Sequence, residues 1–349
     1  VGTSIKIKTA YNNYMKNFPL IGLGIATKGS SGNTLDTFFP CISFKNIEDE
    51  FSQYYEIWDS LMSENVAEIK DTASLNLQDE SLNSAISNLN ENKIIVLCRI
   101  LENQPIQTIE EAYLKLHLIS YKHFEPNSLN LENLFDSLLN VAWTNQGPIE
   151  LGEIDKRILS AQKNNRPLEI KSVDKFPCLT NYIIPPGVRI GDASRVRLGA
   201  YLSEGTTVMH EGFVNFNAGT LGPAMIEGRI SAGVVIGKNS DLGGGCSTMG
   251  TLSGGNDIKI SIGENCLLGA NSGLGIPLGD NCIIEAGLYI TGGSKITKYN
   301  ANNEPESVIK ASELAGCNNL LFIRNSQTGA IEAKINPKSV ELNEELHKN

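Results

Sequence analysis

The feature that most constrains this 349-residue chain is a six-residue spacing of aliphatic side chains in its second half. A small or acidic residue commonly follows the aliphatic one, as in Ile236-Gly237 and Ile226-Glu227. Six is neither the helical period of about 3.6 nor the alternation of a simple strand. The series comprises Ile184, Ile190, Val196, Leu202, Val208, Val214, Thr220 and Ile226, then Ile230, Ile236 and Leu242, then Ile262, Leu268 and Leu274, then Leu278, Ile284, Ile290 and Ile296.

A solenoid with three flat faces per coil explains this period. Each face is a short strand whose aliphatic residue points into a triangular interior, so that one coil takes about 18 residues and about six coils form. Glycine recurs because the corners need positive φ angles, which glycine adopts without a Cβ clash. The alternative, an irregular glycine-rich β-sandwich, does not explain four stretches of regular spacing. Where the period breaks, above all at 248–261, we expect a loop that could carry part of a site.

The residues before the repeat have an ordinary globular pattern. The apolar run IIVLCRI at 94–100 predicts a buried strand. Apolar residues at helical spacing predict helices at 46–62, 109–124, 131–143 and 153–163. Four prolines between 164 and 186 indicate a link to the repeat.

These patterns predict four segments. They are an α/β domain at 1–125, a helical linker region at 126–183, the β-helix at 184–297 and a C-terminal extension at 298–349.

Charge and cysteine usage limit the function classes. The net charge of -10 leaves no broad basic face for a nucleic-acid backbone. The seven cysteines are dispersed without a CxxC pair, which is typical of reduced thiols. No signal-peptide core opens the sequence and no apolar run of about 18 residues occurs. We expect a cytoplasmic protein without nucleic-acid or membrane partners.

An ordered set of motifs follows the repeat. The set is VRIGDASRVRLGAYL at 188–202, MHEGFVNFNAGT at 209–220, MIEGRIS at 225–231, SDLGGG at 240–245, MGTLSGG at 249–255, LLGANSGLGI at 267–276, EAGLYIT at 285–291 and NNLLFIRNS at 318–326. In this order the motifs closely resemble the long-form tetrahydrodipicolinate N-succinyltransferases of bacterial lysine biosynthesis. The resemblance covers about 188–345, and the residues before it match only in length and general character. Hexapeptide repeats alone are a weak signal because many acyltransferases contain them.

The resemblance implies a fold, an assembly and a reaction. The fold is a left-handed parallel β-helix, and the assembly is a homotrimer, in which heterologous contacts close into a ring. The co-substrate is succinyl-CoA, whose pantetheine arm lies between neighbouring subunits. The acceptor is the amine of 2-amino-6-oxopimelate, the ring-opened form of tetrahydrodipicolinate, in diaminopimelate and lysine biosynthesis.

Glu227 is the candidate catalytic residue. Acyl transfer from a thioester to an amine needs a neutral amine, a route for its proton and stabilisation of the oxyanion. The resemblance assigns the catalytic carboxylate to Glu227, either as a general base or as the carrier of a transient acyl-anhydride, and the sequence leaves both roles open. Arg229 points to the same side if the segment is a strand, and its guanidinium could bind a carboxylate. The alternatives are a solvated glutamate and a structural ion pair.

The resemblance assigns contacts with acyl-CoA to a larger set of residues. Small residues allow an amide-containing arm to approach the backbone, and positive charges suit its phosphates. Corner glycines and solvated cations are the alternatives. The set is Arg229, Gly244, Ser247, Ala270, Glu285, Ala286, Gly293, Lys310, Ile323, Arg324, Asn325 and Ser326.

Glu211 matches an acidic position that holds Mg²⁺ on the threefold axis in some relatives. Three symmetric carboxylates would repel one another unless a cation or protons intervene. Those relatives also carry an aspartate where this chain has Ser194, and a hydroxyl is a poorer ligand. Glu211 is therefore the candidate metal ligand, at a site that Ser194 weakens.

Other functions on the same scaffold remain as alternatives. Acetyl-transferring relatives typically use a histidine base, and the only histidine in this repeat is His210. A metal hydratase needs three converging histidines, which four histidines in the whole chain do not favour. A non-catalytic assembly module has no need for Glu227 beside a CoA-lining series. The preference for a succinyl donor rests on the resemblance alone.

Overall fold

The computed structural model describes residues 17–45, 64–70, 80–252 and 258–336, so the helix predicted at 46–62 lies outside them. The chain divides into two compact units. Unit 1 comprises Val1–His117 and Asn130–Phe176, and unit 2 comprises Leu118–Leu129 and Pro177–Asn349. This division differs from the four segments predicted from the sequence. Among the described residues, no helix is long and apolar enough to cross a membrane.

Unit 1 contains an antiparallel sheet with the strand order β2-β1-β4-β3. The elements of this part are β1 (Leu20–Lys28), β2 (Thr34–Phe44), β3 (Val66–Ile69), α2 (Glu80–Ser87), β4 (Lys93–Ile100) and α3 (Ile109–Ser120). Leu82 and Ile86 of α2 join a buried cluster with Leu23 and Leu97 of the sheet. Strand β4 confirms the strand predicted at 94–100, and α3 confirms a helix that is shorter than the predicted 109–124.

A second, three-stranded sheet corrects the prediction of a helical linker. Its order is β6-β5-β7, and the elements are α4 (Leu134–Ser137), β5 (Val141–Thr144), β6 (Gly147–Glu150), α5 (Ile154–Lys163) and β7 (Ile170–Asp174). Helix α5 confirms the helix predicted at 153–163. The helix predicted at 131–143 is wrong beyond Ser137, because Val141–Thr144 is a buried central strand paired on both edges. Strand formation there suits β-branched Val141 and aromatic Trp143.

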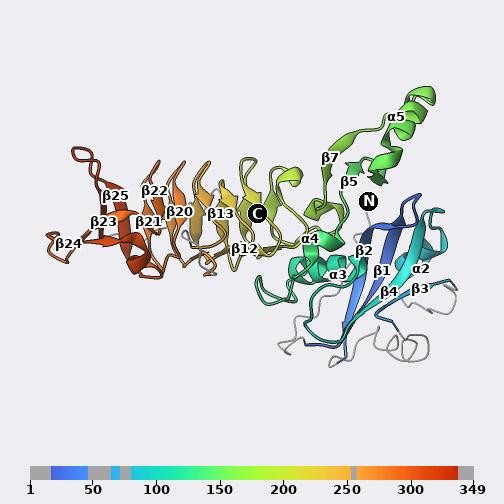
Figure 1. Cartoon of the computed structure of the whole chain (residues 1–349), viewed down its shortest axis with the longest axis horizontal. Coiled ribbons are helices and arrows are strands. Elements are labelled where there is room, and N and C mark those ends of the chain that lie inside the picture. Colours follow the sequence, from blue (N-terminus) through green and yellow to red (C-terminus); the bar gives the residue numbers. More distant parts are fainter. Residues whose placement is uncertain (1–16, 46–63, 71–79, 253–257, 337–349) are drawn as a thin grey trace. The chain divides into compact units, whose positions relative to one another are not determined.

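Unit 2 is dominated by three stacks of short parallel strands, which Figure 1 shows as the row of parallel arrows from β12 to β22. Face A contains β8 (Arg189–Ile190), β10 (Thr206–Val208), β13 (Ala224–Ile226), β16 (Ser240–Leu242), β19 (Leu267–Leu268), β21 (Ile283–Ile284) and β25 (Leu320–Arg324). Face B contains β11 (Phe213–Val214), β14 (Arg229–Ile230), β17 (Ser247–Thr248), β20 (Gly273–Gly275) and β22 (Tyr289–Thr291). Face C contains β9 (Ala200–Leu202), β12 (Ala218–Thr220), β15 (Val235–Ile236) and β18 (Ser261–Ile262).

The chain visits the faces in the order A, B, C, as a solenoid requires. Beyond β22, strands β23 (Lys295–Tyr299), β24 (Pro305–Lys310) and β26 (Ile331–Ile335) extend face A past β25. The parallel strands and the six-residue repeat are those of a parallel β-helix.

The inward positions confirm the six-residue period. Val208, Ile226, Leu242, Leu268 and Ile284 lie in register on face A, and each is 0% exposed. Their partners are 18, 16, 26 and 16 residues apart along the chain, so coil length varies while the interior register is kept. The longest coil contains the segment 248–261, for which a loop is predicted. Its end residues belong to β17 and β18, and residues 253–257 lie outside the described ranges.

Two positions, one at the start of the series and one in the gap after Leu242, depart from the predicted pattern. Ile184 is 77% exposed and lies before the first paired strand, so the prediction of an inward side chain is wrong there. Thr248 is 0% exposed and continues the phase from Leu242. Its hydroxyl donates to the carbonyl of Arg229 at 3.0 Å, which allows a polar residue to take an aliphatic position.

Corner glycines with positive φ angles are confirmed at Gly205, Gly233 and Gly287, where φ is 84°, 83° and 72°. The glycines that directly follow inward residues have a different role. Gly237 has no positive φ, but a Cβ there would lie 2.5 Å from the carbonyl carbon of Gly263 in the next coil. The φ angles of Asn217, Asn239 and Asn265 are 54°, 58° and 54°, which places them in the left-handed region at coil corners. Asparagine tolerates this region because its short side chain bonds locally. Glycine after an inward residue therefore permits close stacking of coils.

Gly237→Ala tests this stacking. We expect the free energy of unfolding to fall by about 1–3 kcal/mol, because the added methyl meets backbone that cannot move without breaking the ladder. Gly293→Ala is the control, since nothing lies within 4 Å of a Cβ there, and its effect should be below about 0.5 kcal/mol. Denaturant unfolding measures both, and equal effects of the two changes would contradict close stacking as the reason for Gly237.

Candidate active site

One corner of the solenoid collects many of the predicted site residues. Residues that follow the strands of face A in successive coils are bonded to the next coil through their backbones. The carbonyls of Glu227, Gly244 and Ala270 accept from Gly245 N at 3.1 Å, Asn271 N at 2.9 Å and Gly287 N at 2.8 Å. Neighbouring strands lie about 4.8 Å apart, so these residues form a row parallel to the solenoid axis. We call them the corner row: Glu211, Glu227, Gly244, Ala270 and Ala286.

Two carboxylates of the corner row border the same glycine. A Cβ at Gly244 would lie 3.6 Å from Oε2 of Glu227 and 3.7 Å from Oε2 of Glu211. Glu227 is half-buried, and its backbone carbonyl accepts from Gly245 N at 3.1 Å. Any side chain at position 244 would enter the space in front of both carboxylates. Gly244 therefore leaves Glu227 accessible.

Arg229 and Ser247 lie beside the corner row on face B. They are register partners in β14 and β17, and Arg229 Nε donates to Ser247 Oγ at 3.0 Å. This bond fixes the plane of an exposed guanidinium. Neither Nη of Arg229 has a hydrogen-bond partner among the described residues. The arrangement can bind a carboxylate or a carbonyl oxygen next to Glu227.

Acidic and thiol groups meet behind Glu227. Burial and the nearby Glu227 raise the pKa of Asp241 to about 6. Burial, then Asp241 and then Glu227, raise the pKa of the Cys246 thiol to about 12, and its Sγ occupies the space that a Cβ on Gly228 would need. The thiol therefore stays protonated at neutral pH and is no nucleophile. Asp241 takes up a proton near pH 6 beside the candidate catalytic residue.

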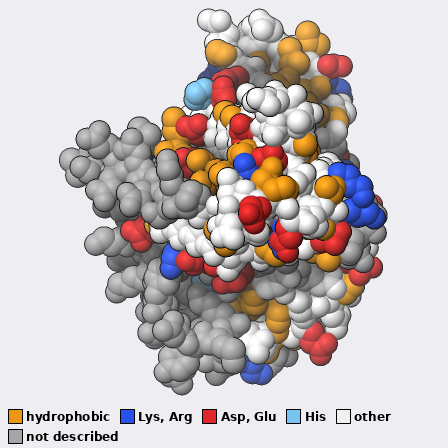
Figure 2. All heavy atoms as spheres, turned by 90° about the vertical axis from the view of Figure 1, so that its left-hand side faces the viewer, with side chains coloured by type: hydrophobic (Ala, Val, Ile, Leu, Met, Phe, Trp, Pro, Cys, Tyr) orange, Lys and Arg blue, Asp and Glu red, His pale blue; other side chains and the backbone are white. Residues whose placement is uncertain are grey.

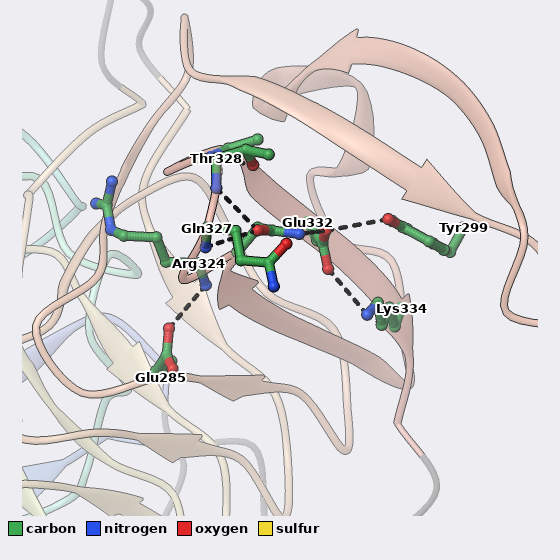
Figure 3. Close-up of polar contacts among 9 residues, drawn as sticks. Glu285, Tyr299, Arg324, Gln327, Thr328, Glu332 and Lys334 are labelled. Atoms are coloured by element: carbon green, nitrogen blue, oxygen red, sulfur yellow. Dashed lines mark hydrogen bonds and ion pairs between the residues drawn. The ribbon is translucent and has the colours of Figure 1, made fainter.

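The C-terminal end of the corner row continues into β25. Glu285 N donates to Phe322 O at 3.0 Å, and Oε2 of Glu285 accepts from Arg324 N at 2.7 Å, so Ile323 and Arg324 lie next along the row (Figure 3). Both ends of the Asn325 amide are engaged within the turn that follows. Ser326 is exposed in the same turn.

Gly293 and Lys310 lie elsewhere, Gly293 in the turn between β22 and β23 and Lys310 at the end of β24. Ala311 N donates to Ser294 O at 2.9 Å, which brings the end of β24 beside the turn that contains Gly293. Lys310 faces Lys295 across the β23–β24 pair, and both are exposed. Figure 2 views this end of the molecule, where acidic and basic side chains are interspersed with apolar ones.

The described residues of this chain do not gather further metal ligands around the predicted position Glu211. The Ser194 hydroxyl donates to Asp192 Oδ1 at 2.7 Å, and Asp192 also accepts from Ser194 N, bonds that lower the pKa of Asp192. Glu211 is exposed, and its nearest charged partner is His210 at 3.9 Å. Within the described ranges, no group of three His, Cys, Asp or Glu side chains could hold a metal ion.

Sequence reasoning missed three residues that the structure places at or near this site. Asp241 lies in the SDLGGG motif, but nothing in the sequence showed that its side chain would be half-buried beside Glu227. The Tyr289 ring covers Gly273 on face B, where Gly273 is the register partner of Ser247. Lys295 is opposite Lys310 only through an antiparallel pairing that the six-residue period does not predict.

Comparison with known proteins agrees with this architecture. The family model described as "Hexapeptide repeat of succinyl-transferase" matches residues 259–292, and "Tetrahydrodipicolinate N-succinyltransferase middle" matches residues 138–177. A solved structure from Campylobacter jejuni, titled as a putative 2,3,4,5-tetrahydropyridine-2-carboxylate N-succinyltransferase, has a TM-score of 0.81 and 33% identity, over 95% of this chain and 96% of that one.

Curated relatives carry the similarity into unit 1. Two of them, from Pseudomonas aeruginosa and Vibrio cholerae, are named 2,3,4,5-tetrahydropyridine-2,6-dicarboxylate N-succinyltransferase. The first is 57% identical over 270 residues, 77% of this chain and 78% of the relative. The second is 46% identical over 337 residues, 94% of this chain and 98% of the relative. The similarity therefore extends well before residue 188.

The stacked coils, together with the matches to the family models, place the chain among the hexapeptide-repeat transferases. The length and sequence identity of the matches to the named relatives identify the family more specifically than the fold does. The chain belongs to the family of 2,3,4,5-tetrahydropyridine-2,6-dicarboxylate N-succinyltransferases.

Asp241→Asn should make stability less dependent on pH. The pKa of Asp241 is about 6 in the folded protein and 3.8 as the reference value, so the folded state binds the proton more tightly. Stability is therefore highest when Asp241 is protonated and falls as pH rises from about 4 to 6. Above pH 7 the variant should be more stable by on the order of 1 kcal/mol, allowing for solvent screening. Thermal unfolding at pH 4.5–8 measures this, and a difference that does not change with pH would contradict it.

Proposed function

We propose that this chain transfers the succinyl group of succinyl-CoA to the amine of ring-opened tetrahydrodipicolinate. The products are N-succinyl-2-amino-6-oxopimelate and CoA, in the diaminopimelate route to lysine. Membership of the N-succinyltransferase family supports this acyltransferase activity and its co-substrate. The observation that carries the choice of site is the corner row, in which Glu227 faces open space over Gly244 beside the Arg229–Ser247 pair.

Glu227 acts on the amine. The reaction breaks the thioester C–S bond and forms an amide C–N bond, so the amine must lose a proton and the CoA sulfur must gain one. A half-buried carboxylate beside the amine can take that proton as a general base. The acyl-anhydride alternative would place the succinyl group on the same carboxylate first.

Arg229 and Ser247 orient the acyl group. The succinyl carboxylate carries a charge that an acetyl group lacks, and a guanidinium whose Nε already binds Ser247 presents its Nη groups to it. An Arg–carboxylate pair can be bidentate, which fixes position as well as distance. A succinyl donor is preferred to an acetyl donor for this reason.

The pantetheine arm follows the corner row toward β25. Gly244, Ala270 and Ala286 keep this edge free of bulk, while their backbone groups repeat at strand spacing. At the far end, Lys310 and Arg324 provide positive charge for the CoA phosphates. Opposed lysines repel one another, so Lys295 and Lys310 also favour an anion between them.

A homotrimer of left-handed β-helices is the proposed assembly. Leu267, Ile283 and Leu321 are register partners on the outward side of face A, and all three are only partly buried. Outward positions of a strand are usually polar, so an apolar ladder favours contact with a second copy. In such a trimer three Glu211 side chains could meet at the axis, but Ser194 is bonded to Asp192, so we derive no step through Mg²⁺. The seven cysteines are dispersed along the sequence without a CxxC pair, which supports a reducing compartment, the cytoplasm.

Glu227→Gln should lower kcat with succinyl-CoA by about 100-fold or more, because the amide cannot accept the proton of the amine. Release of CoA thiol on addition of tetrahydrodipicolinate measures the rate. The control is Glu264→Gln, which removes an exposed ion pair with Lys238 elsewhere in the solenoid and should leave kcat unchanged. Acetyl-CoA, assayed in parallel, should be the poorer donor.

Two results would count against this proposal. Near-normal turnover of a folded Glu227→Gln variant would remove Glu227 from the mechanism. No CoA release by the unaltered protein with either donor would remove the activity itself.

The oligomeric state tests the apolar ladder. We expect three copies of the chain by sedimentation velocity, and the double variant Leu267→Glu, Ile283→Glu should sediment as a single chain because burying carboxylates is costly. Val308→Glu is the control, since Val308 is 65% exposed on β24 and should not alter assembly. A double variant that still sediments as three copies would exclude this surface from the interface.

A further inference from the structure

A buried carboxylate lies beneath the turn that carries three predicted CoA contacts. The turn joins β25 to β26 and begins at Arg324, Asn325 and Ser326. Glu332 of β26 is only 4% exposed, so it does not reach a ligand bound outside. Its carboxylate is bonded to Asn325 of the turn and to Tyr299 of β23. Figure 3 shows Glu332 between Tyr299 and the turn that carries Gln327 and Thr328.

Glu332 has three donors. Oε1 accepts from Asn325 Nδ2 at 2.8 Å and from Tyr299 OH at 3.0 Å. Oε2 pairs with Lys334 Nζ at 2.8 Å, and that ammonium lies 4.6 Å from the centre of the Tyr299 ring. Lys334 and then Asn325 keep the pKa of Glu332 below its usual range, so the carboxylate is ionised at neutral pH.

Asn325 connects Glu332 to the backbone of the turn. Because Nδ2 donates to Glu332, Oδ1 must face the backbone, where it accepts from Gln327 N and Thr328 N at 3.0 Å each (Figure 3). Asn325 N also donates to Ala330 O, and Gly329 N donates to Asn325 O, both at 2.8 Å. The amide therefore has one orientation, and the turn has one conformation.

Arg324 is held by the same turn. Its Nη1 donates to Gly329 O at 3.2 Å, and its backbone N donates to Glu285 Oε2. The guanidinium thus depends on the position of Gly329, which depends on Asn325. Apolar residues of similar volume often stabilise a fold as well as a buried ion pair does. A buried carboxylate that fixes one loop conformation is better explained by what the loop must present.

We propose that Glu332 is a positioning residue, which through Asn325 holds the 324–329 turn in the conformation that presents Arg324 and Ser326 to the nucleotide end of acyl-CoA. This inference rests on the proposed function. It adds a residue that contacts neither substrate nor co-substrate. Removing the charge of Glu332 should therefore weaken the binding of acyl-CoA without slowing the acyl-transfer step.

Glu332→Gln tests the inference in the full-length protein. We expect KM for succinyl-CoA to rise roughly ten-fold, the effect of losing one charged hydrogen bond, with kcat and KM for the amine little changed. With succinyl-pantetheine, which lacks the nucleotide, the variant and the unaltered protein should have the same KM. The control is Glu306→Gln, which removes the exposed ion pair with Lys298 on the neighbouring hairpin and should change neither constant.

Tyr299→Phe is the second variant, should Glu332→Gln fail to fold. It removes one donor to Oε1, keeps the ring under Lys334, and should raise KM for succinyl-CoA by a smaller factor. An equal rise of KM for succinyl-CoA and succinyl-pantetheine would overturn the inference, because it would indicate a general loss of structure. So would an unchanged KM for succinyl-CoA.

Calorimetric titration with free CoA separates this inference from the proposed function. If the unaltered protein binds CoA and turns over succinyl-CoA while Glu332→Gln binds CoA equally well, only the inference fails. If the unaltered protein neither binds CoA nor releases it from succinyl-CoA, the proposed function fails and the inference with it.

Discussion

The hydrogen bonds between successive coils are the constraint on which unit 2 depends. A strand of two or three residues cannot satisfy its own backbone groups, so each must find partners in the coil before and the coil after. This pairing fixes the register, and the register places every inward side chain above an equivalent one, as with Leu242 and Leu268. The six-residue period in the sequence is a consequence of that stacking. Glycines such as Gly237 follow from it, because two backbones must lie within contact distance.

The same stacking of coils also aligns the residues of the candidate site. Once coils are in register, residues that follow face A stand in one row even though coils of 16, 18 and 26 residues separate them along the chain. The difference in coil length does not disturb the row, because the face A strands on either side stay in register. A rigid edge of this kind suits an elongated thioester, since small residues leave space along it and Glu227 stands where the row meets Arg229 on face B. The proposed site thus lies on elements whose spacing the backbone sets.

Predictions from the sequence were confirmed within the repeat. They failed where pairing with distant strands, or the position of the first coil, determines the local structure. The buried positions from Val196 to Ile296 follow from periodicity alone, and the ordered motifs correctly indicated the family. The predicted helix at 131–143 failed because its apolar spacing fits a helix as well as a short central strand, and pairing with β6 and β7 decided between them. Ile184 failed because a period does not show where the first coil begins. Roles at Glu227 and along the CoA series stay predictions, since motif matching places residues but does not measure turnover.

The sequence by itself determined the solenoid and its interior, because a strict repeat of side-chain size admits few ways to bury those side chains. The ordered motifs, and not the period, indicated the family. The sequence also placed Glu227, Arg229 and Gly244 among the candidates through local motifs. Only the tertiary structure brought Asp241 against Glu227 and Glu332 beneath the turn at Asn325. Glu332 contacts Asn325, which is 7 residues away along the chain, and Tyr299, which is 33 residues away. The raised pKa of Asp241 depends on how deeply its side chain is buried. A six-residue period shows neither these contacts nor the burial of Asp241, so the electrostatics of the candidate site depend on tertiary packing.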